Sequence, residues 1–138
     1  MRVSEIMTRD VVAVPVDATL VEAAQLMRDH DIGFLPVIAS DVVVGVITDR
    51  DLVVRGLGEN MNAALTPVRS VMSANPVWCY AYDVLTDAAD ILANNHLHRL
   101  IVVDSNRRLC GLLSIDDLAV NMSSDRLLGD TVRQITAM

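Results

Sequence analysis

The sequence predicts an α/β chain made of two β-α-β-β-α repeats that pack about a pseudo-twofold axis. Residues 3–55 align with residues 68–121 at an offset of 65 that later becomes 66. Each copy alternates short apolar, strand-like runs with segments of helical spacing. The octet GVITDRDL at 45–52 also returns as GLLSIDDL at 111–118. Self-similarity of this extent indicates a duplicated supersecondary unit.

The elements follow the same order in both copies. A short turn, VSEIM at 3–7 or VRSVM at 68–72, precedes an extended segment at 11–14 or 77–80. A helix follows, because apolar residues recur at helical spacing; they are Leu20, Ala23, Ala24 and Met27, mirrored by Leu85, Ala88, Ala89 and Leu92. Two strands joined by a polar turn come next, at 34–39 and 42–48 or at 99–104 and 109–114. A second helix begins at Thr48 or Ser114.

We expect repeat 1 at 1–56, a linker at 57–67, repeat 2 at 68–122 and a helical tail at 123–138. The tail has one apolar stripe, formed by Leu127, Leu128, Thr131, Val132 and Ile135. A unit of roughly 55 residues with a two-sided sheet cannot easily bury both faces alone. Pairing of the two repeats about the pseudo-twofold axis would bury them.

Composition narrows the class of protein. The net charge is −7, and all eleven basic residues are arginine, so nucleic acid and anionic membranes are poor partners. No apolar run reaches the roughly 18 residues of a membrane helix, and the amino terminus has no signal-peptide pattern. Cys79 and Cys110 form no CxxC motif, which suits a reducing compartment. The expected location is therefore cytoplasmic.

The two octets hold the side chains that could bind a ligand. Thr48 and Ser114 stand where a strand ends and a helix begins, so their hydroxyls can cap free backbone N–H groups, which also attract phosphate. Asp51 and Asp117 lie one turn along, and a carboxylate accepts hydrogen bonds well from the two hydroxyls of a ribose. The pattern S/T-x-x-D is also a capping box that needs no ligand, and the two interpretations are compatible.

Each octet begins with a glycine, Gly45 or Gly111. Because glycine lacks a β-carbon, it permits close approach by a flat base or a sugar. In that interpretation the octet binds phosphate, ribose and base in order.

The whole pattern resembles a cystathionine-β-synthase (CBS) domain pair, or Bateman module. The segments that carry the resemblance are IM, LVEAAQLMRDHDIGFLPV, GVITDRDL, NNHLHRLIVVD and GLLSIDDL. The last two are similar to the closing repeat of AMP-activated kinase γ subunits. The resemblance implies two adenosine-type pockets between the repeats. In each, the aspartate binds ribose, the hydroxyl faces phosphate, and the start of the other repeat's first strand lines the base.

The resemblance also implies the residues of each pocket. One pocket would combine Thr48, Asp51, Ser73, Val77 and Trp78. The other would combine Ser114, Asp117, Thr8, Val12 and Ala13.

Other positions make the two pockets unequal. His98 and Arg99 match the family's HR pair, which supplies cations to phosphates, whereas the first repeat has Gly33 and Phe34 there. Trp78 replaces a small residue and would either stack on adenine or plug its pocket.

Metal binding and catalysis are disfavoured. If the stretch around them is extended, His96 and His98 point to one face, where Cys79 and Cys110 would complete a transition-metal site. A solvated or phosphate-facing role of the histidines is the simpler interpretation. Adjacent residues on a helix diverge by about 100°, so Asp116 and its neighbour Asp117 would not face one substrate. The sequence holds no nucleophile–base constellation and no metal motif.

The sequence therefore favours a non-enzymatic regulatory module that senses AMP, ADP, ATP, NAD or S-adenosylmethionine. Such a module requires no resident cofactor and would act through a homodimer or an unknown effector protein. The expected dimer surface is the pair of helices at 20–27 and 85–92. The alternative is a ligand-independent dimerisation adaptor with degenerate pockets.

Overall fold

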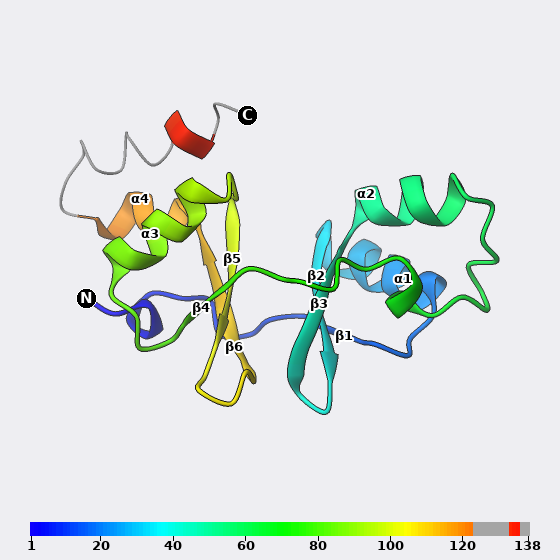
Figure 1. Cartoon of the computed structure of the whole chain (residues 1–138), viewed down its shortest axis with the longest axis horizontal. Helices are drawn as coiled ribbons and strands as arrows, with labels where there is room; N and C mark the ends of the chain where they lie inside the picture. Colours follow the sequence, from blue (N-terminus) through cyan, green and yellow to red (C-terminus); the bar gives the residue numbers. More distant parts are fainter. Residues whose placement is uncertain (123–132, 136–138) are drawn as a thin grey trace. The chain divides into compact units, whose positions relative to one another are not determined.

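The computed structural model describes residues 1–122 and 133–135, and it divides the chain into two compact units (Figure 1). Unit 1 is Met1–Val11 with Val77–Met138, and unit 2 is Val12–Pro76. Each unit holds one three-stranded sheet, with its helices on one face. The predicted α/β fold of two β-α-β-β-α repeats is confirmed. Their pseudo-twofold packing stays a prediction.

Unit 2 contains the first repeat. Its elements are β1 (Val14–Pro15), α1 (Leu20–His30), β2 (Phe34–Ala39), β3 (Val42–Thr48), α2 (Asp49–Asp51), η2 (Leu52–Leu57) and η3 (Val68–Ser70). The central strand β2 pairs parallel with β1 and antiparallel with β3. The first strand is shorter than the extended segment expected at 11–14, because its pairing with β2 begins only at Val14.

Unit 1 contains the second repeat. Its elements are η1 (Val3–Glu5), β4 (Trp78–Tyr80), α3 (Leu85–Asn94), β5 (Arg99–Val103), β6 (Leu109–Ser114) and α4 (Ile115–Asn121). The sheet repeats the arrangement of unit 2, with β5 parallel to β4 and antiparallel to β6. The second helix differs between the repeats. After its first turn, the helix of unit 2 continues as the π-helix η2, whereas α4 is a regular α-helix.

The apolar stripe of each long helix packs against the sheet of its own unit. The core of unit 2 includes Leu20, Ala23, Met27, Leu35 and Val37. The core of unit 1 includes Leu85, Ala88, Ala89, Leu92, Leu100 and Val102. Most of each stripe is therefore buried inside its own unit, whereas Ala24 of the first stripe is exposed. The homodimer through these helices stays a prediction.

The opening segment of each repeat packs on the sheet of the other repeat. Thr8 bridges antiparallel to Leu112 of β6, and Ser73 bridges antiparallel to Val46 of β3. The sequence repeats and the compact units therefore have different boundaries, since residues 1–11 belong with the second repeat.

The predicted tail lies outside the described residues except at 133–135. Of its expected stripe, Leu127, Leu128, Thr131 and Val132 are not described. Ile135 is buried in the core of unit 1, beside α3 and α4 residues.

Candidate functional site

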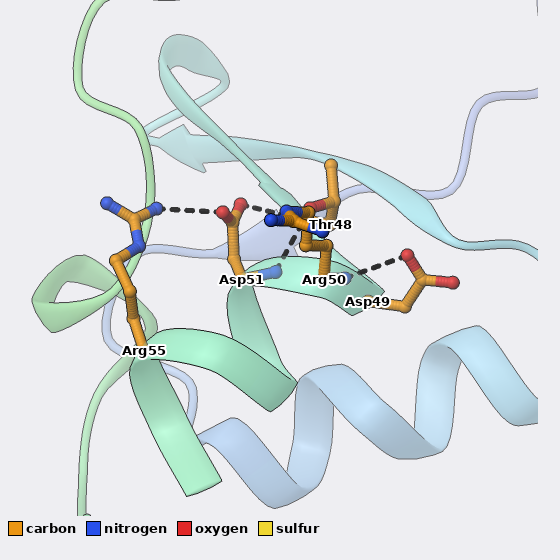
Figure 2. A network of polar contacts seen from close by, with 5 residues as sticks. All are labelled: Thr48, Asp49, Arg50, Asp51 and Arg55. Atoms are coloured by element: carbon orange, nitrogen blue, oxygen red, sulfur yellow. Dashed lines mark hydrogen bonds and ion pairs between the residues drawn. The ribbon is translucent and has the colours of Figure 1, made fainter. Parts of the chain in front are cut away.

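In the first octet, two reciprocal hydrogen bonds join Thr48 and Asp51 (Figure 2). Asp51 N–H donates to Thr48 Oγ1 at 3.2 Å, and Thr48 N–H donates to Asp51 Oδ2 at 2.9 Å. This is the predicted capping box, formed where β3 ends and α2 begins. One carboxylate oxygen of Asp51 is therefore used by the backbone of its own octet.

The other carboxylate oxygen of Asp51 is held by an arginine. Arg55 Nη2 lies 2.9 Å from Asp51 Oδ1, as an i,i+4 ion pair, and Figure 2 shows the guanidinium turned toward the carboxylate. The Asp51 side chain is 18% exposed and that of Arg55 is 45% exposed. Both oxygens of Asp51 thus have a partner in the folded chain.

The second octet repeats the cap but not the ion pair. Asp117 N–H donates to Ser114 Oγ at 3.1 Å, and Ser114 N–H donates to Asp117 Oδ2 at 2.8 Å. Asn121 occupies the position that matches Arg55, and its amide donates to the Asp117 backbone carbonyl at 2.7 Å. Within residues 1–122 and 133–135, no hydrogen bond or ion pair to Asp117 Oδ1 is formed. In the described residues, this oxygen thus lacks the counterpart of the Arg55 contact to Asp51.

The two glycines have a different role from the one predicted. A β-carbon placed on Gly45 would lie 2.7 Å from both Met72 Sδ and the Ser73 carbonyl oxygen. On Gly111 it would lie 2.6 Å from the Thr8 carbonyl oxygen. The close approach that requires glycine is made by the chain's own opening segments, so the interpretation of an open space for a base or sugar is corrected.

These bridges bring two predicted site residues to the octets. Ser73 and Val46 exchange backbone hydrogen bonds of 3.0 and 2.9 Å, two residues before Thr48. Thr8 and Leu112 exchange two of 2.9 Å, two residues before Ser114. The predicted association of Ser73 with the first octet and of Thr8 with the second therefore has a structural basis.

A hollow of about 360 Å³ opens at the second octet. It is lined by His98, Arg99, Ser114, Ile115 and Asp116. The strand pairing explains this grouping, because Arg99 is the register partner of Ser114 and Ile115 N–H donates to the His98 carbonyl at 3.0 Å. The HR pair and the octet hydroxyl thus meet in one cavity.

Sequence reasoning missed two residues of this hollow, Ile115 and Asp116. Asp116 was set aside because neighbouring helix positions diverge. That divergence turns Asp116 toward the hollow, while Asp117 forms the cap. Pairing the predicted strands at 99–104 and 109–114 would have placed the start of the following helix beside His98 and Arg99.

The family model of the CBS domain matches residues 3–57 and 68–124. The chain belongs to the CBS domain family. Among curated relatives, the CBS domain-containing protein YhcV of Bacillus subtilis is 36% identical over 97% of this chain and 94% of its own length. Hypoxic response protein 1 of Mycobacterium tuberculosis is 30% identical over 83% of this chain and 80% of its own.

Solved CBS structures share the fold. A crystal structure of Hypoxic Response Protein I with two coordinated zinc ions has a TM-score of 0.81 and 28% identity, and covers 88% of this chain and 99% of its own. The CBS domain protein PAE2072 from Pyrobaculum aerophilum, complexed with AMP, has a TM-score of 0.75 and 25% identity over 95% of this chain and 98% of its own. CBSX2 in complex with AMP has a TM-score of 0.74 and 26% identity, over 86% and 93%.

The remaining predicted residues of this CBS pair fall in separate units. Val12 and Ala13 belong to unit 2, and Val77 and Trp78 belong to unit 1, so their joint pockets stay predictions. The Arg107 guanidinium lies 4.7 Å from the centroid of the Trp78 ring. One face of that indole is therefore covered by a cation–π contact.

At the HR position, the first repeat has Gly33, and the side chain of Asp49 lies beside it. A β-carbon on Gly33 would lie 2.6 Å from Asp49 Oδ2. In the second repeat the matching residues are His98 and Ile115. The carboxylate of the exposed Asp49 thus occupies the space beside Gly33 and would have to move if a side chain stood there.

The two cysteines, Cys79 and Cys110, form no disulfide in the part of the chain that the structure describes. Among the described residues, no three His, Cys, Asp or Glu side chains are grouped to hold a metal ion. Burial raises the pKa of the Cys79 thiol to about 12 and also raises the pKa of Cys110. His96 Nδ1 lies 2.6 Å from the Gln134 carbonyl oxygen. None of the described helices is long and apolar enough to span a membrane.

Proposed function

We propose that this CBS pair is a regulatory sensor that binds an adenosine-containing ligand at its octets. The observation that carries the proposal is the hollow at the second octet, which places His98 and Arg99 beside the Ser114 cap. The ligand class comprises AMP, ADP, ATP, NAD and S-adenosylmethionine. The bound state would act on a homodimer or a partner protein.

The chemistry of the hollow fits a phosphorylated nucleoside. Arg99 supplies a guanidinium, which makes strong, charge-assisted hydrogen bonds to phosphate. Asp117 lies at the same octet, and its Oδ1, which has no hydrogen-bond partner among the described residues, can accept from hydroxyl groups such as those of ribose. A ligand held by both would need a phosphate and a diol.

Two relatives support the choice of ligand. The structures of PAE2072 and CBSX2 were obtained with AMP. The proposal includes neither catalysis nor a resident cofactor, since the adenosine compound is the regulatory ligand itself.

A second function, a ligand-independent adaptor, is favoured by a different observation. In both octets the hydroxyl and the carboxylate already satisfy each other as a capping box, so neither needs a ligand to complete its hydrogen bonds. If no adenosine compound binds, the octets are helix caps only.

Both the sensor and the adaptor need a surface through which the chain associates with a second copy or with a partner. A groove of about 370 Å³ between α1 and η2 is lined by Leu20, Val21, Ala24, Gln25, Arg28, Leu52, Leu57 and Ala63. Leu57 of this groove is 70% exposed, and Val53, also in η2, is 58% exposed. We propose this surface, which includes Leu20 and Ala24 of the expected stripe, as the homodimer contact, because association would remove its apolar area from water.

Mass spectrometry of small molecules released from the purified protein tests the sensor directly. We expect an adenosine compound, and titration of that compound into stripped protein should raise the thermal midpoint. A chain that releases no adenosine compound, and whose midpoint no member of the class raises, would be an adaptor.

A further inference from the structure

In each octet, one carboxylate oxygen of the aspartate accepts a hydrogen bond from the backbone of the capping residue. Thr48 N–H occupies Asp51 Oδ2, and Ser114 N–H occupies Asp117 Oδ2. A ligand hydroxyl therefore meets mainly the other oxygen, Oδ1, of each carboxylate. The surroundings of that oxygen decide how well the octet can accept a diol.

The two Oδ1 atoms have different surroundings, which depend on the residue four positions after each aspartate. In the first octet this residue is Arg55, whose Nη2 lies 2.9 Å from Asp51 Oδ1. In the second it is Asn121, whose amide reaches the backbone carbonyl of Asp117 instead. Figure 2 shows that the Arg55 side chain leaves the helix toward the carboxylate.

We propose that Arg55 is a positioning residue that makes the two octets unequal in affinity. It acts through Asp51, since a ribose hydroxyl at that oxygen competes with the guanidinium. Asp117 has no such competitor among the described residues, so the ligand fills the second octet first. The inference rests on the proposed function, because it concerns the same ligand.

The size of the effect follows from the strength of the ion pair. A carboxylate oxygen has more than one acceptor position, so Arg55 weakens binding without abolishing it. Exposed i,i+4 pairs correspond to about a twofold change in an equilibrium constant. Because Asp51 is only 18% exposed, we expect the change to lie between about twofold and fivefold.

Calorimetric titration with adenosine and with AMP tests the inference in two backgrounds. Asp117→Ala leaves only the first octet, and there Arg55→Asn should tighten adenosine binding by about twofold to fivefold. Asp51→Ala leaves only the second octet, and there Asn121→Arg should weaken it by a similar factor. Arg69→Asn is the matched control, since it breaks an exposed ion pair with Asp17 in the same unit and should change neither affinity.

Two results would overturn the role of Arg55. Adenosine affinity in the Asp117→Ala background would be unchanged by both Arg55→Asn and Arg55→Gln, in proteins that keep the parent's circular dichroism. Alternatively, both substitutions would weaken AMP more than adenosine, which would make Arg55 a phosphate contact. Arg55→Lys keeps the charge and should stay closer to the parent affinity. Wild-type protein that binds neither compound would contradict the proposed function instead.

Discussion

Thr8 and Leu112 exchange two backbone hydrogen bonds of 2.9 Å, each donating its N–H to the carbonyl of the other. This antiparallel bridge attaches the first residues of the chain to the sheet of the second repeat. The equivalent bridge between Ser73 and Val46 attaches the start of the second repeat to the sheet of the first. The last strand before each octet is therefore bridged by the opening segment of the other repeat.

The bridge explains why glycine precedes each octet hydroxyl by three residues, and it predicts the result of filling that space. Gly111→Ala would push a β-carbon against the Thr8 carbonyl oxygen and Met7 Sδ, at 2.6 and 2.8 Å. Because the first neighbour is backbone, we expect a loss of about 1–3 kcal/mol in the free energy of unfolding, measured by urea denaturation.

Gly56→Ala is the control for that substitution. Its β-carbon would meet only the end of the Leu20 side chain, at 3.2 Å, and alanine favours a helix by about 1 kcal/mol. It should be neutral or stabilising. Equal stability of Gly111→Ala and wild type would contradict the role of the bridge.

The sequence predicted the local elements well because their signals are local. The paired strands β2–β3 and β5–β6 follow from apolar runs joined by tight polar turns, and the caps of Thr48 and Ser114 follow from the S/T-x-x-D pattern. Each of these features is decided by residues close together in the chain.

The features that the sequence did not reveal depend on distant contacts. The exchange of opening segments pairs Thr8 with a residue of the other repeat, and nothing near Thr8 in the chain encodes that partner. For the same reason the space beside Gly45 and Gly111 was assigned to a ligand. The π-helical turns of η2 depart from the 3.6-residue period on which helix prediction rests.

A pH prediction follows from the buried Cys79 thiol. Desolvation raises its pKa in the folded state to about 12 from the ordinary 9.0, so the unfolded chain loses this proton first. The stability that this thiol contributes is fully present below pH 9 and is lost as the pH rises toward 12. The slope reaches at most about 1.4 kcal/mol per pH unit.

Urea midpoints of wild type and Cys79→Ala between pH 8 and 10.5 would measure this term. The variant has a smaller core residue and starts less stable, so the comparison is between slopes. The wild-type midpoint should fall more steeply with pH. Parallel curves would contradict a protonated, buried thiol.

The surface beside η2 predicts an oligomer. Leu57→Asp places a charge at a 70% exposed position of the groove between α1 and η2. We expect light scattering to give twice the 15.0 kDa chain mass for wild type and a shift toward the monomer for the variant. Val120→Asp, at an 83% exposed position of α4, is the matched control. A wild-type particle of 15.0 kDa at micromolar concentration would contradict the proposed dimer.

Arg99 predicts a difference between ligands with and without phosphate. Its guanidinium lines the hollow and would donate to phosphate but not to the sugar or base. Charge-assisted hydrogen bonds are worth about 1.5–3 kcal/mol when desolvated, and Arg99 is exposed, so we expect Arg99→Ala to weaken AMP about tenfold at most. Adenosine affinity should be nearly unchanged. Arg108→Ala, in the turn between β5 and β6, controls for net charge, and an equal loss for both ligands would make Arg99 structural.

The last prediction separates the two roles of Asp117, as helix cap and as ligand acceptor. Asp117→Asn keeps a side-chain oxygen that can accept from Ser114 N–H, whereas Asp117→Ala removes it. We therefore expect the ligand-free stability to fall by about 0.5–2 kcal/mol for alanine and by less for asparagine.

Binding should respond differently, because a ribose diol needs the charged acceptor. An AMP concentration of a hundred times the dissociation constant adds about 2.7 kcal/mol to the wild type at one site, and both variants should lose that contribution at the second octet. A thermal-shift series with and without AMP measures both effects on the same samples. If Asp117→Asn kept the full response to AMP while Asp117→Ala lost only ligand-free stability, the carboxylate would be a cap alone.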